Sequence, residues 1–191
     1  ESGLLIIEKF VREGVPVSMR PIGIESKRDM LDEYVDHLLS LVDLSQIRKL
    51  NVVIDAGNGM AGHTAPAVFK RINADVTEMF YELDGSFPNH EANPIDEANL
   101  RDLKKMVKKK SADIGLAFDG DADRCFLVDE NGDAVNPSLL TALIADRDLA
   151  KLPGSPIIYN LISSRAVKEI IEERGGKPLR SRVGHSYIKA M

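Results

Sequence analysis

The sequence predicts an α/β protein built from consecutive α/β units, with an acidic loop at the carboxyl end of a buried strand. Short apolar runs alternate with amphipathic segments along most of the chain, which is typical of sheets covered by helices. Glycine, proline, asparagine and serine separate these runs, as expected for turns between strands and helices. The acidic loop, residues 119–124, reads Asp-Gly-Asp-Ala-Asp-Arg and directly follows one of the apolar runs.

The composition argues against several classes of protein. The chain has 191 residues, 43% of them hydrophobic and 29% charged, which suffices for one or two domains with hydrophobic cores. A net charge of −5 argues against a nucleic-acid surface, which needs a basic face. The single cysteine, Cys125, excludes an internal disulfide, and no apolar run reaches the ~18 residues of a membrane span. We therefore expect a cytoplasmic protein with neither nucleic-acid nor membrane partners.

The first segment is strongly apolar. Residues 4–11 carry hydrophobic side chains on more than one helical face, so a helix here needs partners on two sides. We expect the segment to be disordered or packed on another molecule, which makes it a candidate surface for homo-oligomer formation. Prolines and glycine in residues 15–24 predict a linker.

An amphipathic helix is predicted over residues 30–42, because hydrophobic side chains recur there at three- and four-residue spacing. The tetrapeptide Ser-Lys-Arg-Asp at residues 26–29 resembles a capping box at the start of this helix. We expect a new domain to begin at this point.

A glycine motif follows the next apolar run. Residues 51–55 predict a buried strand, and Gly57-Asn-Gly-Met-Ala-Gly62 opens a predicted helix over residues 64–72. This spacing matches the dinucleotide-binding fingerprint, and the next predicted strand, residues 75–83, ends at Asp84, where a ribose-binding carboxylate is sought. An NAD(P)-binding dehydrogenase is therefore an alternative function. The competing interpretation is a tight turn in which the glycines only permit close packing.

A lysine-rich helix is predicted over residues 96–110. Its lysines favour a solvated helix face over a nucleic-acid site, because lysine forms helices well and suits a helix carboxyl end. The buried strand of residues 113–118 then leads into the acidic loop. Residues 125–135 predict a hairpin that turns at Asn131-Gly132.

The acidic loop is the strongest chemical signal. Held together, the carboxylates of Asp119, Asp121 and Asp123 repel one another, and a hard cation such as Mg²⁺ removes the conflict. Arg124 is suited to binding a phosphate next to the metal through two parallel hydrogen bonds. An EF-hand is a second interpretation, since Glu130 stands at its twelfth position, but Arg124 replaces the glycine required at the sixth. A solvated acidic turn is the third. His90 is not expected to bind a metal, because oxygen ligands dominate the site.

A further α/β unit follows. Asn136-Pro137 begins a predicted helix, residues 156–162 and 177–183 predict strands, and Ser163-Ser164 caps the helix between them. The β-α-β order places a domain boundary near Asn136. His185 lies in the last strand-to-helix turn, where it can bind phosphate or serve only as a residue near the helix cap. Lys189, one turn later, is placed to support the same anion.

Four motifs together resemble the α-D-phosphohexomutase superfamily, which contains the phosphomannomutases and phosphoglucomutases. The acidic loop is similar to the family's metal loop, which usually reads Asp-Gly-Asp-Gly-Asp-Arg, so that Ala122 replaces a glycine. The other motifs are Val-Ile-Asp-Ala-Gly-Asn-Gly at residues 53–59, Phe-Pro-Asn-His at 87–90 with Asn93-Pro94, and Val-Gly-His-Ser-Tyr-Ile-Lys at 183–189.

The resemblance implies consecutive three-layer α/β units with mixed sheets. It makes residues 1–25 the tail of a first domain and a linker, residues 26–135 a metal-binding α/β domain, and residues 136–191 the amino-terminal part of a further α/β domain. The chain is then expected to be a piece of a longer protein.

The resemblance also implies an activity, the interconversion of hexose 1- and 6-phosphates through an enzyme phosphoserine and a bisphosphate. Asp119, Asp121 and Asp123 would hold Mg²⁺, Arg124 would steady the phosphoryl group or the sugar, and His185 with Lys189 would bind the distant phosphate. Some relatives carry a lysine where this chain has Ile162, so one sugar contact is expected to be missing. The family's catalytic serine is not recognised in this chain, which we expect to be inactive alone.

Overall fold

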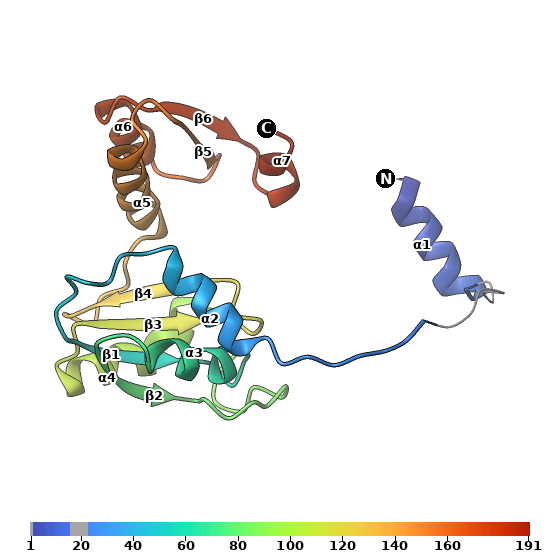
Figure 1. Ribbon diagram of the computed structural model, residues 1–191, viewed down its shortest axis with the longest axis horizontal. Helices are drawn as coiled ribbons and strands as arrows, with labels where there is room; N and C mark the ends of the chain where they lie inside the picture. Colours follow the sequence, from blue (N-terminus) through green and yellow to red (C-terminus); the bar gives the residue numbers. More distant parts are fainter. Residues whose placement is uncertain (1, 16–22) are drawn as a thin grey trace. The chain divides into compact units, whose positions relative to one another are not determined.

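The computed structural model describes residues 2–15 and 23–191, and it divides between Met30 and Leu31 into two compact units. The first unit contains helix α1 (Ser2–Glu13). Figure 1 draws this helix in blue at the amino-terminal end of the chain. Its hydrophobic side chains are exposed, and self-association through it stays a prediction. Residues 16–22 of the predicted linker lie outside the described residues.

The second unit begins with helix α2 (Leu31–Ser40), in which Val35 is buried. The helix starts five residues after Ser26, so the predicted capping box is wrong: Ser26 is too far from the first turn to bond its free N–H groups. An ion pair between Asp36 and Arg71, with an N–O distance of 2.6 Å, joins α2 to the segment after helix α3 (Ala61–Phe69).

The larger sheet contains four strands in the order β2-β1-β3-β4: β1 (Leu50–Asp55), β2 (Ala74–Met79), β3 (Ile114–Phe118) and β4 (Cys125–Asp129). Strand β1 runs parallel to β2 and β3, whereas β4 runs antiparallel to β3. Asp55 pairs with Met79 on one side and with Ala117 on the other. The carboxyl ends of three strands therefore meet at one edge, and the predicted mixed sheet is confirmed.

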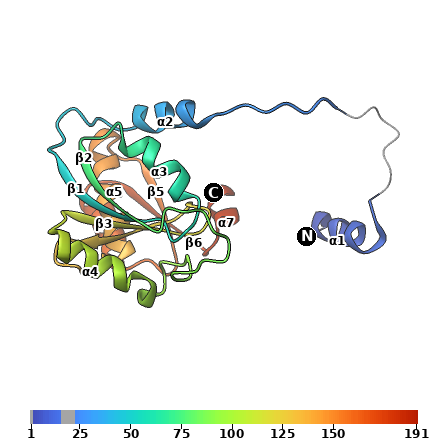
Figure 2. The ribbon, with the colours of Figure 1, turned by 90° about the horizontal axis from the view of Figure 1, so that it is seen from below.

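Helices cover both faces of this sheet (Figure 2). Alternate residues of β1 point to opposite faces. Val52 and Ile54 pack with Ala65 of α3, whereas Val53 packs with Leu103 and other residues of the opposite layer. That layer is formed by α4 (Arg101–Lys110), preceded by the short 3₁₀ helix η1 (Glu97–Leu100).

Two strands differ from their predicted lengths. Strand β2 stops at Met79 because Phe80 adopts a left-handed backbone conformation with φ 55°, which an extended strand cannot contain. The predicted hairpin over residues 125–135 has one full arm, β4, and its second arm is reduced to an isolated bridge between Val128 and Ala134. The full partner of β4 is β3, so the acidic loop itself connects the two arms of the hairpin.

The smaller sheet consists of two parallel strands, β5 (Pro156–Asn160) and β6 (Lys177–Ser181), so the predicted mixed pairing holds for the larger sheet only. Helices α5 (Pro137–Lys151) and α6 (Arg165–Glu173) share one core with β5, and the short helix α7 (His185–Lys189) follows β6. The predicted caps of α5 and α6 are formed by the side chains of Asn136 and Ser164. The boundary between residues 135 and 136 stays a prediction.

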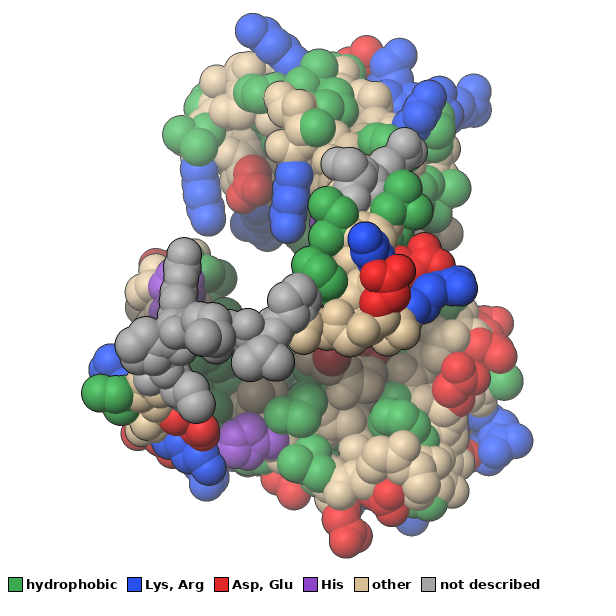
Figure 3. All heavy atoms as spheres, turned by 90° about the vertical axis from the view of Figure 1, so that its right-hand side faces the viewer, with side chains coloured by type: hydrophobic (Ala, Val, Ile, Leu, Met, Phe, Trp, Pro, Cys, Tyr) green, Lys and Arg blue, Asp and Glu red, His purple; other side chains and the backbone are tan. Residues whose placement is uncertain are grey.

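No helix in the described part of the chain combines the length and the apolar character needed to cross a membrane. Hydrophobic side chains lie exposed between charged ones on the face shown in Figure 3.

Candidate metal centre

The acidic loop is a tight connection between paired strands. Phe118 pairs with Cys125, and the backbone N–H of Asp119 donates to the carbonyl oxygen of Arg124 at 3.3 Å. Inside this frame the N–H of Ala122 donates to the carbonyl oxygen of Asp119 at 3.1 Å. The chain reverses direction at Ala122, whose φ of 61° lies in the left-handed region that favours glycine.

This bend gathers the three aspartates. One carboxylate oxygen from each of Asp119, Asp121 and Asp123 lies within 4.8 Å of the other two. Asp119 is 1% exposed, whereas Asp121 and Asp123 face solvent. The arrangement therefore combines one buried carboxylate with two exposed ones.

Arg124 holds the buried carboxylate from two directions. Its backbone N–H donates to Oδ1 of Asp119 at 3.0 Å, and its Nε donates to Oδ2 at 2.5 Å. The same Nε lies 3.3 Å from Oδ1 of Asp123. Burial opposes ionisation of Asp119, but the hydrogen bonds and charge of Arg124 outweigh it, so the pKa of this carboxyl lies below its ordinary value. Arg124 therefore stabilises the charged form of Asp119.

The loop has the donor set that a hard divalent cation prefers. Carboxylate oxygens are typical Mg²⁺ ligands, and opposite ligands of that ion are about 4 Å apart. At most one pair among three octahedral ligands can be opposite, and adjacent ligands lie about 3 Å apart. The separations of up to 4.8 Å are wider than this, so Asp121 and Asp123 would have to turn inward to share one ion. The EF-hand interpretation fails, because the loop is flanked by β3 and β4 and not by two helices.

The glycine motif after β1 supports the acidic loop. The backbone N–H of Met60 donates to the carbonyl oxygen of Gly120 at 3.0 Å. A Cβ atom on Gly59 would lie 2.6 Å from that same oxygen, and one on Gly62 would overlap the backbone of Tyr81. These two glycines of the motif thus permit backbone-to-backbone packing, as the competing interpretation expected.

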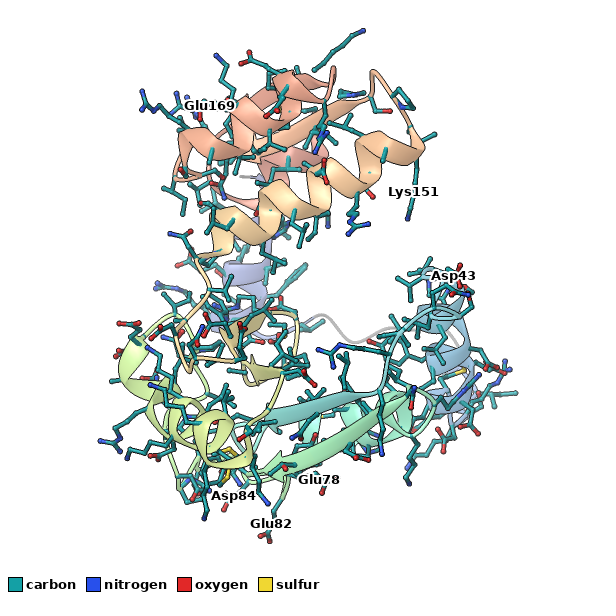
Figure 4. The ribbon with its side chains drawn as sticks, turned by 90° about the vertical axis from the view of Figure 1, so that its left-hand side faces the viewer. Asp43, Glu78, Glu82, Asp84, Lys151 and Glu169 are labelled. Atoms are coloured by element: carbon teal, nitrogen blue, oxygen red, sulfur yellow. The ribbon has the colours of Figure 1, made fainter. Side chains whose placement is uncertain are left out.

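The dehydrogenase alternative is accordingly not favoured. Asp84, the expected ribose ligand, accepts hydrogen bonds from the N–H and hydroxyl of Ser86 at 2.9 and 2.7 Å. It lies with Glu82 on the surface segment after β2 (Figure 4). The Cβ direction of Gly59, from which a pyrophosphate would approach closely, is occupied by the backbone of Gly120.

Sequence reasoning missed a pair of residues at this edge of the sheet, Asp55 and His90. Asp55 ends β1 and is 1% exposed; its Oδ1 accepts the N–H of Gly57 at 2.9 Å, and its Oδ2 lies 3.0 Å from Nε2 of His90. Burial raises the pKa of Asp55, and the histidine and the Gly57 N–H oppose the rise. The available sequence signal was the Phe-Pro-Asn-His motif at residues 87–90. In the structure its histidine ring packs edge-on against Phe80.

The two predicted phosphate ligands belong to the other α/β unit. His185 is the first residue of α7 and follows Gly184, whose φ is 126°. His185, Lys189 and Ile162 are all exposed, and Ile162 follows the end of β5. Their predicted roles stay predictions, as do those of the three aspartates and Arg124.

Comparison with known proteins places the chain in a family. Residues 32–132 match the family described as "Phosphoglucomutase/phosphomannomutase, alpha/beta/alpha domain II", and residues 136–191 match its domain III. A phosphoglucomutase of Neisseria gonorrhoeae is 40% identical over 168 residues, which is 88% of this chain and 36% of that protein. A phosphomannomutase of Vibrio cholerae is 36% identical over 99% of this chain and 42% of that protein.

The fold agrees with this assignment. A phosphoglucomutase/phosphomannomutase family protein from Burkholderia thailandensis has a crystal structure that matches with a TM-score of 0.80 and 39% identity. The match covers 85% of this chain and 35% of that one. The chain thus spans well under half the length of the relatives it matches. The matches to domains II and III together with these identities show that the chain belongs to the phosphoglucomutase/phosphomannomutase family, within the α-D-phosphohexomutase superfamily.

Proposed function

We propose that residues 119–124 form the Mg²⁺ site of a phosphohexomutase, and that the protein containing this chain interconverts hexose 1- and 6-phosphates. In the proposed reaction a phosphoserine donates its phosphoryl group to the sugar phosphate, and the resulting bisphosphate returns its other phosphoryl group to the serine. The observation that carries the proposal is the gathering of three carboxylates within 4.8 Å in a chain that belongs to this family.

Each residue has a defined task in this proposal. Asp119, Asp121 and Asp123 hold Mg²⁺, which supplies positive charge next to the transferring phosphoryl group. Arg124 has a second function besides ordering Asp119: it offers guanidinium donors to a phosphate oxygen or the sugar. His185 and Lys189 bind the phosphate at the non-reacting end of the substrate.

The chain alone is expected to be catalytically inactive, because no serine in it stands in the Ser-His-Asn context of the family's nucleophile. A coupled assay with glucose 1-phosphate and a bisphosphate activator tests this expectation. We expect no rate from the pure chain. Measurable turnover by the chain would refute the proposed dependence on a serine outside it.

Metal binding is testable on the chain itself. We expect Mn²⁺, used as a paramagnetic substitute for Mg²⁺, to broaden NMR signals of residues 119–124 with weak affinity, because the phosphoserine ligand is missing. Asp121→Asn and Asp123→Asn should each weaken binding at least tenfold, since each removes one charged ligand.

Asp133→Asn is the matched control for these variants, because Asp133 lies in another exposed turn. Its substitution should leave Mn²⁺ affinity unchanged. If both site variants bound Mn²⁺ as tightly as the unmodified chain, the metal site would be disproved. Titration with NADH should produce no fluorescence change, in agreement with the packed glycines.

A further inference from the structure

Three loops meet at the carboxyl edge of the larger sheet. They are the β1–α3 connection (residues 56–60), the segment between β2 and η1 (residues 80–96), and the acidic loop (residues 119–124). The buried carboxylate of Asp55 stands where the first loop begins, and the ring of His90 projects from the second.

Hydrogen-bond geometry determines where the His90 ring carries its protons. Nδ1 lies 2.9 Å from the carbonyl oxygen of Glu91, which can only accept, so Nδ1 carries a hydrogen. Nε2 lies 3.0 and 3.2 Å from the two carboxylate oxygens of Asp55. A hydrogen must also lie between these groups, because two lone pairs at this distance repel. Asp55 and His90 therefore share one proton, either as carboxylate and imidazolium or as carboxylic acid and imidazole.

The hydrogen-bonded pair joins the second loop (residues 80–96) to the start of the first loop (residues 56–60). Beside it, the side-chain amide of Asn89 donates to Oδ1 of Asn58 at 2.7 Å. Asn58 in turn donates through its own amide to the carbonyl oxygen of Glu82 at 2.8 Å. These bonds run between loops that are 24 to 35 residues apart in the sequence, so they define tertiary and not local structure.

These two loops in turn contact the acidic loop at Gly120. Met60 of the first loop donates to the carbonyl oxygen of Gly120. From the second loop, the ring of Phe87 and the side chain of Ala92 lie 3.5 and 3.9 Å from the point where a Cβ of Gly120 would stand. Gly120 separates Asp119 from Asp121, so a shift of this residue moves two of the three carboxylates.

We propose that Asp55 and His90 are positioning residues for the acidic loop, and that their shared proton is the bond on which this positioning depends. The effect on metal binding rests on the metal site proposed above. The effect on the loop itself does not, because the contacts to Gly120 are formed by protein atoms alone.

The first test replaces the histidine. His90→Phe keeps a ring against Phe80 but removes both ring nitrogens, so the Asp55 carboxylate keeps only the Gly57 N–H. We expect hydrogen exchange of the Met60 amide, which bonds to Gly120, to accelerate at least tenfold. Mn²⁺ affinity should fall on the order of tenfold. His37→Phe, an exposed histidine on α2, is the matched control and should change neither quantity.

The second test replaces the carboxylate. In Asp55→Asn the amide oxygen can accept the Gly57 N–H while the amide nitrogen donates to Nε2 of a neutral His90, which restores one shared hydrogen without charge. We expect Met60 exchange and Mn²⁺ affinity within about threefold of the unmodified chain. This variant also provides the test if His90→Phe does not fold.

Several outcomes would overturn the proposal. One is His90→Phe with unchanged Met60 exchange. Another is an Asp55→Asn variant whose Met60 exchange and Mn²⁺ affinity change as much as those of His90→Phe. A hydrogen kept between the two side chains would then not be what holds the acidic loop in place. A third is a ¹⁵N spectrum showing His90 without a hydrogen on Nε2 while Asp55 is ionised, because no hydrogen would then lie between the two side chains. If the unmodified chain bound no Mn²⁺, the proposed metal site would fail, and Met60 exchange would still decide the positioning role.

Discussion

At Ala122 the backbone has φ 61°, a conformation that costs a non-glycine residue roughly 1–2 kcal/mol. The same turn accounts for the gathering of Asp121 and Asp123, so the strain lies within the candidate metal loop. The family's usual glycine at this place would adopt the conformation without a Cβ clash.

Ala122→Gly should therefore stabilise the chain by about 0.5–1 kcal/mol, because relief of strain exceeds the extra entropy of glycine in the unfolded chain. The free energy of unfolding in urea measures the change. Ala134→Gly is the control at an exposed alanine without positive φ, and it should lower stability. Equal destabilisation by both variants would contradict the argument.

Asp113 shows how a single half-buried carboxylate makes stability depend on pH. Its Oδ1 accepts a hydrogen bond from Arg48 and its Oδ2 accepts one from the N–H of Asn51, at 2.6 and 2.7 Å. The Arg48 contact, followed by the Asn51 N–H, lowers the pKa of Asp113 in the folded chain. This contribution to stability is therefore present above the ordinary pKa of an aspartate and is lost as pH falls through the folded-state pKa.

Asp113→Asn should lower the urea midpoint at pH 7, and the difference from the unmodified chain should shrink as the pH is lowered below about 4. Urea titrations at several pH values measure this. Asp75→Asn, which loses only an exposed ion pair with Lys49, should have a smaller effect at pH 7. A difference that grew at low pH would show that the sign is wrong.

At the scale of elements, the connection between β1 and α3 contacts the connection between β3 and β4 through their backbones. Parallel pairing of β1 with β3 places the two loops at the same edge. The lack of a side chain at Gly59 then allows the Met60–Gly120 hydrogen bond to form.

Gly59→Ala should destabilise the chain by roughly 1–3 kcal/mol, because the new methyl group meets the Gly120 carbonyl and the acidic loop must move. Mn²⁺ binding should weaken with it. Gly85→Ala is the control, since nothing lies within 4 Å of the added Cβ, and it should leave both quantities nearly unchanged. If Gly59→Ala retained full stability, the close approach of the two loops would be in doubt.

At the scale of the whole molecule, the two sheets have separate hydrophobic cores. Leu103 lies in the core of the larger sheet, and Ile171 lies in the core of the smaller one; each is fully buried. We propose on this basis that residues 31–135 and 136–191, both within the second unit, unfold separately.

Hydrogen exchange followed by mass spectrometry tests this division. Leu103→Ala, which costs roughly 2–5 kcal/mol, should accelerate exchange in β1–β4 and leave α5 and α6 protected. Ile171→Ala should produce the reverse pattern. Acceleration of both regions by either substitution would show that the two regions form one cooperative unit.

Helix α1 presents hydrophobic side chains that its own unit does not cover. Leu4 and Ile7 are 72% and 59% exposed, and burying such residues on a second copy is favourable. We expect the mass measured by sedimentation equilibrium to rise with concentration, and Ile7→Glu to remove the rise. Leu152→Glu, at another exposed leucine, should preserve it. A chain that stayed monomeric at every concentration would refute self-association through α1.

The sequence by itself determined most elements and which side chains the acidic loop offers. Hydrophobic periodicity and turn residues act locally, so the strands β1, β3 and β5 and the caps of α5 and α6 agreed with their predicted positions. The three aspartates predicted a cation site because they lie within five residues of one another, so their grouping also depends on local sequence.

Only the tertiary structure decided what depends on strand order. It paired β4 with β3, placed Gly59 against Gly120, and brought His90 to Asp55 across 35 residues of sequence. It also gave Arg124 a partner inside the loop, in Asp119. These contacts form between segments that are distant in the chain or that must bend together, and local residue preferences carry no information about which such segments meet.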